Sequence, residues 1–177
     1  MCIRDRAHPG TTLTVAGEGT QQDWLVEQAR KHKVLKATRF VGHCDHEDLL
    51  ALLHRADAAV LPSHYEPFGL AALEAAAAGT PLVTTNIGGL GEAVINGQTG
   101  VSCAPRDVAG LADAVRTVLD DPDAAQRRAN AARERLTSAF DWGTVAKETA
   151  QVYLAAKRAE RQPLARLPIE EQALPGR

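Results

Sequence analysis

Hydrophobic positions along this chain recur in two patterns, one typical of strands and the other of helices. Short apolar runs predict β-strands at residues 11–16, 38–41, 58–61, 81–85 and 100–103. Longer segments with apolar side chains three or four positions apart predict helices at residues 21–33, 45–56, 70–78, 90–95, 108–119, 124–140 and 142–157. Because strands and helices alternate, the pattern predicts an α/β fold, a Rossmann-like parallel sheet with helices on both faces.

Local signals support several of these boundaries. The run at 58–61 is wholly apolar, which is typical of a strand buried on both faces of a parallel sheet. Gly79 follows the predicted helix at 70–78 and suits the left-handed turn that ends many helices. Asp141 precedes the last predicted helix, where a carboxylate accepts hydrogen bonds from free backbone N–H groups.

The loops that follow the strands are where a ligand is expected. In open parallel sheets, ligands bind beyond the carboxyl ends of the strands. The loops at that edge are predicted at residues 17–20, 42–46, 62–69 and 86–91. Residues that bind a ligand are therefore expected in these four segments.

One of these loops leads into a helix start that is suited to an anion. Pro67 disfavours helical geometry at the residue before it, so Glu66 lies in the loop and the helix starts near Gly69. The first N–H groups of that helix, those of Gly69, Leu70 and Ala71, are short of intrahelical partners. Together with the helix dipole they form a site that suits a phosphate.

Two carboxylates flank this expected phosphate site. Glu66 stands at its mouth and Glu74 about one turn into the helix, eight positions further along the chain. A carboxylate at either position accepts hydrogen bonds from hydroxyls, such as those of a ribose or another sugar. The alternative is structural: Glu66 stabilises the helix dipole, and Glu74 is a solvated helix residue.

Composition and charge exclude several classes of protein. The 177 residues include 20 Lys and Arg against 22 Asp and Glu, a net charge of −2. This balance excludes a disordered chain and a nucleic-acid binder that works by bulk charge. No apolar run reaches the ~20 residues that cross a bilayer, and no secretory signal stands at the start. We therefore expect a cytoplasmic location without a transmembrane segment.

The cysteines indicate neither a disulfide framework nor a metal cluster. Cys2, Cys44 and Cys103 are widely spaced and odd in number. The run from His43 to His46 contains ligand types, but too few stand at the spacings that zinc sites use. We interpret it as a polar turn and expect no metal and no other cofactor.

The chain resembles the retaining glycosyltransferases of family 4, which have the GT-B fold. Glu66 and Glu74 match the Glu-x7-Glu signature of that family. Further similar segments follow one another in the family's order: 15–19 (VAGEG), 39–42 (RFVG), 56–63 (ADAAVLPS), 78–83 (AGTPLV), 87–94 (IGGLGEAV) and 96–100 (NGQTG). The resemblance is strongest to the actinobacterial, glycogen-synthase-like enzymes that extend α-1,4-glucans, including those of methylglucose lipopolysaccharide synthesis.

This resemblance implies a donor site for a nucleotide sugar. It implies that Glu66 is the catalytic residue, which binds hydroxyls of the donor sugar, and that Glu74 holds the ribose. The implied diphosphate site consists of backbone N–H groups of Leu70 and Ala71. The remaining implied donor-binding residues are Phe68, Gly69, Cys44, Gly17 and Gly19. The implied reaction transfers glucose to a growing α-1,4-glucan with retention of configuration, from a UDP or ADP donor, without a metal and without a protein nucleophile.

The resemblance also implies that this chain is the C-terminal half of a GT-B fold, truncated at its N-terminus. Residues 1–10 are expected to be a non-native or truncated leader, 11–157 the nucleotide-sugar-binding domain and 158–177 an extended or disordered tail. The family's Gly-Arg-x4-Lys-Gly segment, the first strand of this domain and an N-terminal acceptor-binding domain are expected upstream of residue 11. The fragment by itself is therefore expected to be inactive.

Several alternatives stay open at this point. The protein transfers another hexose, such as mannose or GlcNAc, to a lipid or small acceptor; or it is a nucleotide-sugar epimerase of similar fold; or it is a non-catalytic nucleotide-sugar-binding module. His64 and Tyr65 border the acceptor or are ordinary loop residues. Gly88, Gly89 and Glu92 touch the ligand or form a turn before a helix.

Overall fold

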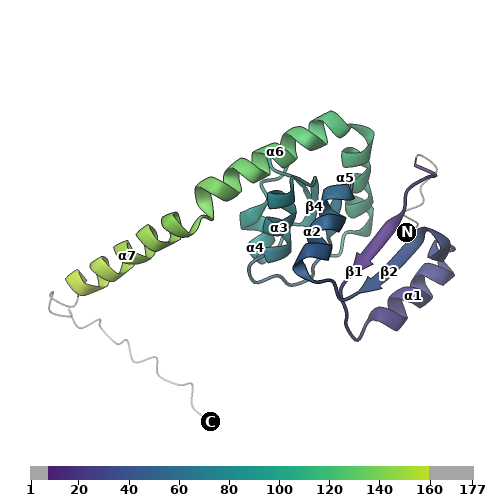
Figure 1. The fold of residues 1–177 in the computed structure, drawn as a ribbon, viewed down its shortest axis with the longest axis horizontal. Coiled ribbons are helices and arrows are strands. Elements are labelled where there is room, and N and C mark those ends of the chain that lie inside the picture. The colour runs from purple at the N-terminus through teal and green to yellow at the C-terminus, as the bar shows by residue number, and fades with distance from the viewer. Residues whose placement is uncertain (1–7, 160–177) are drawn as a thin grey trace, which may run out of the picture. The chain divides into compact units, whose positions relative to one another are not determined.

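The computed structural model describes residues 8–159 (Figure 1). Its strands and helices are β1 (Leu13–Ala16), α1 (Gln22–Lys31), β2 (Thr38–Gly42), α2 (His46–Arg55), β3 (Ala59–Leu61), α3 (Leu70–Ala78), β4 (Leu82–Thr85), α4 (Gly88–Ala93), β5 (Val101–Cys103), α5 (Val108–Asp120), α6 (Pro122–Ala139) and α7 (Trp142–Ala159). A short 3-10 helix, Leu35–Ala37, precedes β2 and was not expected from the sequence. The chain up to Thr137 forms one compact unit, and a second unit begins at Ser138. Most of the predicted leader and tail lies outside the described residues.

All pairings between these strands are parallel, which confirms the predicted α/β class. β1 pairs with β2, and Leu13 lies opposite Thr38. The strand β4 pairs with β3 on one side and with β5 on the other. The described strands therefore form a two-stranded and a three-stranded sheet, where the sequence pattern predicted a single one. Figure 1 shows β1 and β2 beside α1, and β4 among the other helices of the first unit.

The core lies on both faces of the three-stranded sheet. Leu82 packs in a cluster with buried alanines of α3, Leu90 of α4 and Ala132 of α6. Its neighbour Val83 packs in a second cluster with Ala114 and Val118 of α5. Because successive side chains of a strand point to opposite faces, these two clusters show that helices cover both faces of the sheet.

The prediction that residues 58–61 are buried on both faces is wrong for three of the four residues. Ala59 is buried, but Ala58, Val60 and Leu61 are only half-buried. β3 hydrogen-bonds to β4 on one edge, and its other edge has no strand partner among residues 8–159. An edge strand keeps more of its surface in water than a central one, which accounts for the difference.

The helix caps follow the sequence signals closely. Gly69 and Gly79 flank α3 with φ angles of 92° and 75°, so the left-handed cap expected at Gly79 is confirmed. Asp141 caps α7 by accepting hydrogen bonds from the N–H of Gly143 at 2.7 Å and of Thr144 at 3.1 Å. Within residues 8–159, no helix is both long and apolar enough to cross a membrane.

The Asp141 cap predicts acid-sensitive fraying of α7. The Thr144 hydroxyl, the Gly143 N–H and the Thr144 N–H lower the pKa of Asp141. A carboxyl whose pKa is lower in the folded state stabilises the helix above its unfolded pKa of about 3.9, and this contribution is lost as the pH falls through the folded pKa. We expect the NMR Cα shifts of the first turn of α7 to move toward coil values below that pH. The Asp141→Asn variant, which does not titrate, serves as the control; an identical pH response in this variant would contradict the assignment.

Candidate functional site

The loop between β3 and α3 holds Glu66 against the start of α3. The Glu66 carboxylate accepts a hydrogen bond from the Gly69 N–H at 2.9 Å. Its backbone oxygen accepts another from the Gly89 N–H, also at 2.9 Å. Glu66 is therefore half-buried and fixed at both its side chain and its backbone. The sequence placed it in the loop correctly, but not its contact with Gly69.

The backbone N–H groups at the start of α3, where an anion site was expected, do not all have the same role. The Gly69 N–H donates to Glu66, whereas helix geometry leaves the N–H groups of Leu70 and Ala71 without intrahelical acceptors. These two N–H groups, at the positive end of the helix dipole, remain suited to an anion. The same helix end thus orients a carboxylate and offers two donors beside it.

Two glycines of α4 allow this loop to approach closely. A Cβ atom added at Gly88 would lie 2.1 Å from the backbone oxygen of Glu66, and one at Gly89 would lie 2.1 Å from that of Phe68. Such distances are far inside van der Waals contact, so only glycine fits at both positions. Both glycines belong to α4, which begins at Gly88 and not at Leu90, where the sequence pattern predicted its start.

Glu74 lies on α3 where this helix packs against α2. Its Oε1 atom is 3.9 Å from Nδ1 of His46, and its side chain keeps 36% of its surface exposed. His46 is the first residue of α2 and the last residue of the loop predicted at 42–46. The packing therefore brings Glu74 to the loop that contains Cys44, whose half-buried side chain lies 3.9 Å from the Gly42 oxygen.

The loops after β1 and β2 are joined to each other. The Gly17 N–H donates to the Gly42 oxygen at 2.7 Å. The Glu18 carboxylate accepts from the His43 N–H at 3.1 Å. Gly17 and Gly19, both predicted site residues, thus flank a carboxylate that sequence reasoning missed. Its only signal was its position inside the Gly-x-Gly turn.

Three large apolar side chains close to Glu66 in the sequence are exposed. Tyr65, Phe68 and Leu70 are exposed over 81%, 54% and 64% of their surfaces.

The contacts described above place the predicted site residues in two groups. One group runs from Glu66 to Ala71, and the other joins Glu74 to the loops at 17–20 and 42–46. Within residues 8–159, no cluster of three His, Cys, Asp or Glu side chains is arranged to hold a metal ion.

Comparison with known proteins decides the family. Residues 3–135 match the family described as "Glycosyl transferases group 1". The chain belongs to this glycosyl transferase family. Its Rossmann-like fold is accordingly that of the C-terminal half of a GT-B transferase, as the resemblance implied. All the predicted site residues fall within the matched range.

Individual proteins similar to this group 1 transferase chain support the same family. The chain is 85% identical over 172 residues to the glycogen synthase of Mycobacterium tuberculosis, and the aligned region covers 97% of this chain and 42% of that protein. A solved sucrose-phosphate synthase from Thermosynechococcus elongatus is 34% identical with a TM-score of 0.73, over 84% of this chain and 39% of that one. Anabaena Alr3699/HepE in complex with UDP-glucose is 25% identical with a TM-score of 0.72, over 81% and 41%. The chain thus spans less than half the length of each of these relatives.

Proposed function

We propose that this chain is the donor-binding domain of a retaining glucosyltransferase that extends an α-1,4-glucan from a nucleotide-glucose donor. The observation that carries the proposal is the 85% identity to a glycogen synthase across nearly the whole chain. The site supports it because two free N–H groups and two carboxylates suit a diphosphate, a sugar and a ribose. Cytoplasmic location stays a prediction.

The proposed roles follow from the different partners of the backbone N–H groups at the start of α3. The N–H groups of Leu70 and Ala71 bind the diphosphate, while the Gly69 N–H holds Glu66 so that its free carboxylate oxygen meets hydroxyls of the sugar. Glu74 accepts from the ribose, and the loop that contains Cys44 borders the base through its backbone. The exposed ring of Phe68 contributes apolar surface at the mouth.

The chemistry follows from the charge that develops when the sugar–diphosphate bond breaks. Negative charge grows on the leaving diphosphate, and preorganised N–H donors stabilise it. Positive character grows on the sugar ring, beside the carboxylate of Glu66. Holding donor and acceptor in one orientation supplies a further part of the rate. No residue of the chain is assigned as a nucleophile, in keeping with attack from the face of the leaving group.

The transfer is proposed to need no metal ion. The N–H groups at the start of α3, together with cationic side chains from the remainder of the protein, stabilise the charge of the leaving diphosphate, which a divalent cation does in other enzymes. We therefore expect the turnover of the complete protein to be unchanged after exhaustive treatment with EDTA. Loss of activity that Mg²⁺ or Mn²⁺ restores would contradict this part of the proposal.

The assignment of Glu74 predicts a specific loss of donor affinity. In the complete protein, Glu74→Ala removes the ribose acceptor and is expected to weaken nucleotide binding by about 1–3 kcal/mol. Calorimetric titration with UDP and ADP measures this difference. Glu134→Ala, which removes an exposed carboxylate of α6, is the matched control and leaves the affinity unchanged. Unchanged affinity in Glu74→Ala would remove Glu74 from the site.

A donor assay tests the proposed function itself. The complete protein is incubated with UDP-glucose or ADP-glucose and a glucan primer, and is expected to lengthen the primer with at least one of them. The 177-residue chain by itself is expected to be inactive. Binding of the nucleotide without turnover would favour a binding module, and release of free epimerised sugar would favour an epimerase. Transfer of mannose or GlcNAc in place of glucose would favour a different hexosyltransferase.

A further inference from the structure

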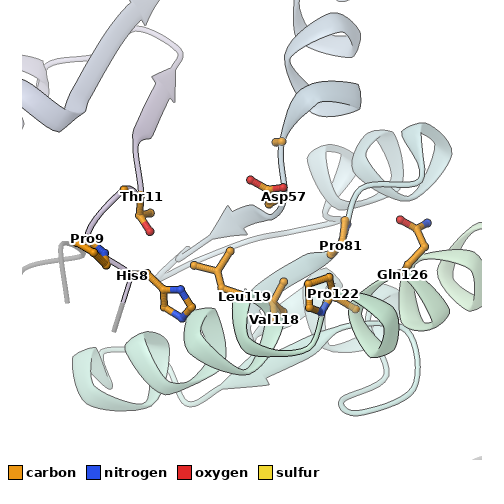
Figure 2. A pocket seen from close by; sticks show the side chains of 12 residues that line it. His8, Pro9, Thr11, Asp57, Pro81, Val118, Leu119, Pro122 and Gln126 are labelled. Carbon is orange, nitrogen blue, oxygen red and sulfur yellow. The ribbon is translucent and has the colours of Figure 1, made fainter. Parts of the chain in front are cut away.

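The strand β4 ends at the edge of the sheet where the candidate site lies. Pro81, directly before β4, lines a cavity of about 570 Å³ at the other end of this strand (Figure 2). The last residue of β4 is Thr85, which contacts the loop at 62–69. Because a strand rises about 3.3 Å per residue, the length of β4 separates this cavity from the candidate site. Thr85 therefore belongs to the site end of the strand.

Two buried threonines end β4, and their hydroxyls differ in their partners. Thr84 and Thr85 keep 0% and 3% of their surfaces exposed. The Thr85 hydroxyl donates a hydrogen bond to the backbone oxygen of Ser63 at 2.6 Å. The Thr84 hydroxyl has no hydrogen-bond partner among the described residues. Burial of a hydroxyl is unfavourable unless it forms a hydrogen bond, and within this pair only Thr85 forms one.

The Thr85 contact begins where the pairing of β3 with β4 stops. The last paired residues are Leu61 of β3 and Thr84 of β4. Pro62 follows Leu61 and has no backbone N–H, so it cannot donate to the ladder. The bond from Thr85 to Ser63 thus comes directly after the ladder and fixes the first residues of the loop.

The segment that contains Thr85 also holds the loop at a second point. Four positions after Thr85, the Gly89 N–H donates to the backbone oxygen of Glu66 at 2.9 Å. Glycine is required at that position, because a Cβ atom would overlap the backbone of the loop. One short stretch of chain, residues 85–89, therefore anchors the loop at Ser63 and again at Glu66, and only two residues separate these anchored positions.

A loop anchored at both points holds the Glu66 carboxylate in one place. Its Oε1 atom accepts from the Gly69 N–H at 2.9 Å, which leaves the second oxygen available to hydroxyls of a sugar. The position of that oxygen depends on the backbone of Glu66, and hence on both anchors. In an active site, a misplacement of about 1 Å can lower the rate about 100-fold.

We propose that Thr85 is a positioning residue for glucosyl transfer: its hydroxyl holds Ser63 and, through the loop, keeps the carboxylate of Glu66 at the donor sugar. The role assigned to Thr85 rests on the role proposed for Glu66 and adds a buried residue of β4 that acts only through the loop. It affects the rate and not donor affinity, because the N–H groups of Leu70 and Ala71 belong to α3, beyond the anchored stretch.

Replacement of Thr85 by Val in the complete protein removes the hydroxyl and keeps the size of the side chain. We expect kcat with a nucleotide-glucose donor and a glucan primer to fall at least about tenfold, with donor affinity within about twofold of the unmodified protein. Thr85→Ser restores the hydroxyl and is expected to recover kcat to within about twofold. Thr84→Val, the matched control, removes a neighbouring buried hydroxyl that has no described partner, and is expected to leave kcat unchanged.

Amide hydrogen exchange reads the same anchor without any activity. The Gly69 and Gly89 N–H groups are the donors to the side chain and the backbone of Glu66. In the complete protein, their exchange is expected to speed up about tenfold in Thr85→Val, because the loop loosens, and to stay unchanged in Thr84→Val. If Thr85→Val does not fold, Thr85→Ala, whose side chain is smaller, takes its place in both experiments.

Four results would overturn the proposal. They are normal kcat in Thr85→Val, unchanged exchange at both N–H groups, equal losses of kcat in the Thr84 and Thr85 variants, and a loss of donor affinity as large as the loss of kcat. Normal kcat in Thr85→Val together with a slow Glu66→Gln protein would overturn only the role of Thr85. If the unmodified protein transfers no glucose, the proposed function fails, while the exchange still decides whether Thr85 positions Glu66.

Discussion

Replacing Glu66 by Gln in the complete protein is expected to lower kcat by about 100-fold, the scale found when one electrostatic stabiliser of a transition state is removed. Gln keeps the size of the side chain and an oxygen that accepts from the Gly69 N–H, so the loop stays in place. What it removes is the negative charge beside a sugar ring that gains positive character. Steady-state assays with saturating donor measure the effect.

The split between kcat and affinity makes this prediction specific. Donor affinity is expected to change little in Glu66→Gln, because the N–H groups of Leu70 and Ala71 and the carboxylate of Glu74 are untouched. Glu134→Gln on α6 is the charge-matched control and is expected to behave as the unmodified protein. A Glu66→Gln protein with normal kcat would show that this carboxylate is only a helix cap.

Replacing Gly89 by Ala is expected to lower the free energy of unfolding of the chain by about 3 kcal/mol, the upper range for overpacking. The new Cβ atom would lie 2.1 Å from the oxygen and 2.2 Å from the carbonyl carbon of Phe68. Both are backbone atoms, so relief requires the loop from Glu66 to Gly69 to move. Urea unfolding measures the stability, and the same variant of the complete protein is expected to lose activity as Glu66 shifts.

Gly91→Ala in the same helix is the matched control for this prediction. Its Cβ atom would meet the side-chain oxygen of Asn86 at 2.6 Å, and that side chain is exposed and free to turn away. Because alanine is the better helix former, Gly91→Ala is expected to be neutral or slightly stabilising. Equal stability losses in the two variants would show that general strain in α4, and not contact with the Glu66 loop, sets the cost.

Features that depend on neighbours in the chain could be predicted from the sequence. The helix α3 has the predicted bounds, 70–78, because a glycine stands at each end and alanines fill the interior. The position of Glu66 in the loop follows from Pro67, and the cap on α7 from Asp141. Alternating strands and helices were enough for the parallel α/β class.

Features that depend on distant parts of the chain could not be predicted in this way. Gly88 and Gly89 lie against the backbone of Glu66 and Phe68, over 20 positions away in the sequence. The contact between Glu18 and His43 requires the pairing of β1 with β2. The approach of His46 to Glu74 requires the packing of α2 on α3. Apolar runs likewise do not reveal which strand edges stay open, and hence the half-exposed β3.

The configuration of the product bond tests directly whether this protein is a retaining α-1,4-glucosyltransferase. The complete protein is given a nucleotide glucose with ¹³C at the anomeric carbon and a short glucan primer, and the new linkage is read by NMR. We expect a labelled α-1,4 bond formed with retention, and slower transfer at low donor concentration in Glu74→Ala, whose donor affinity is weakened. A β linkage, or no transfer from either UDP-glucose or ADP-glucose, would contradict it.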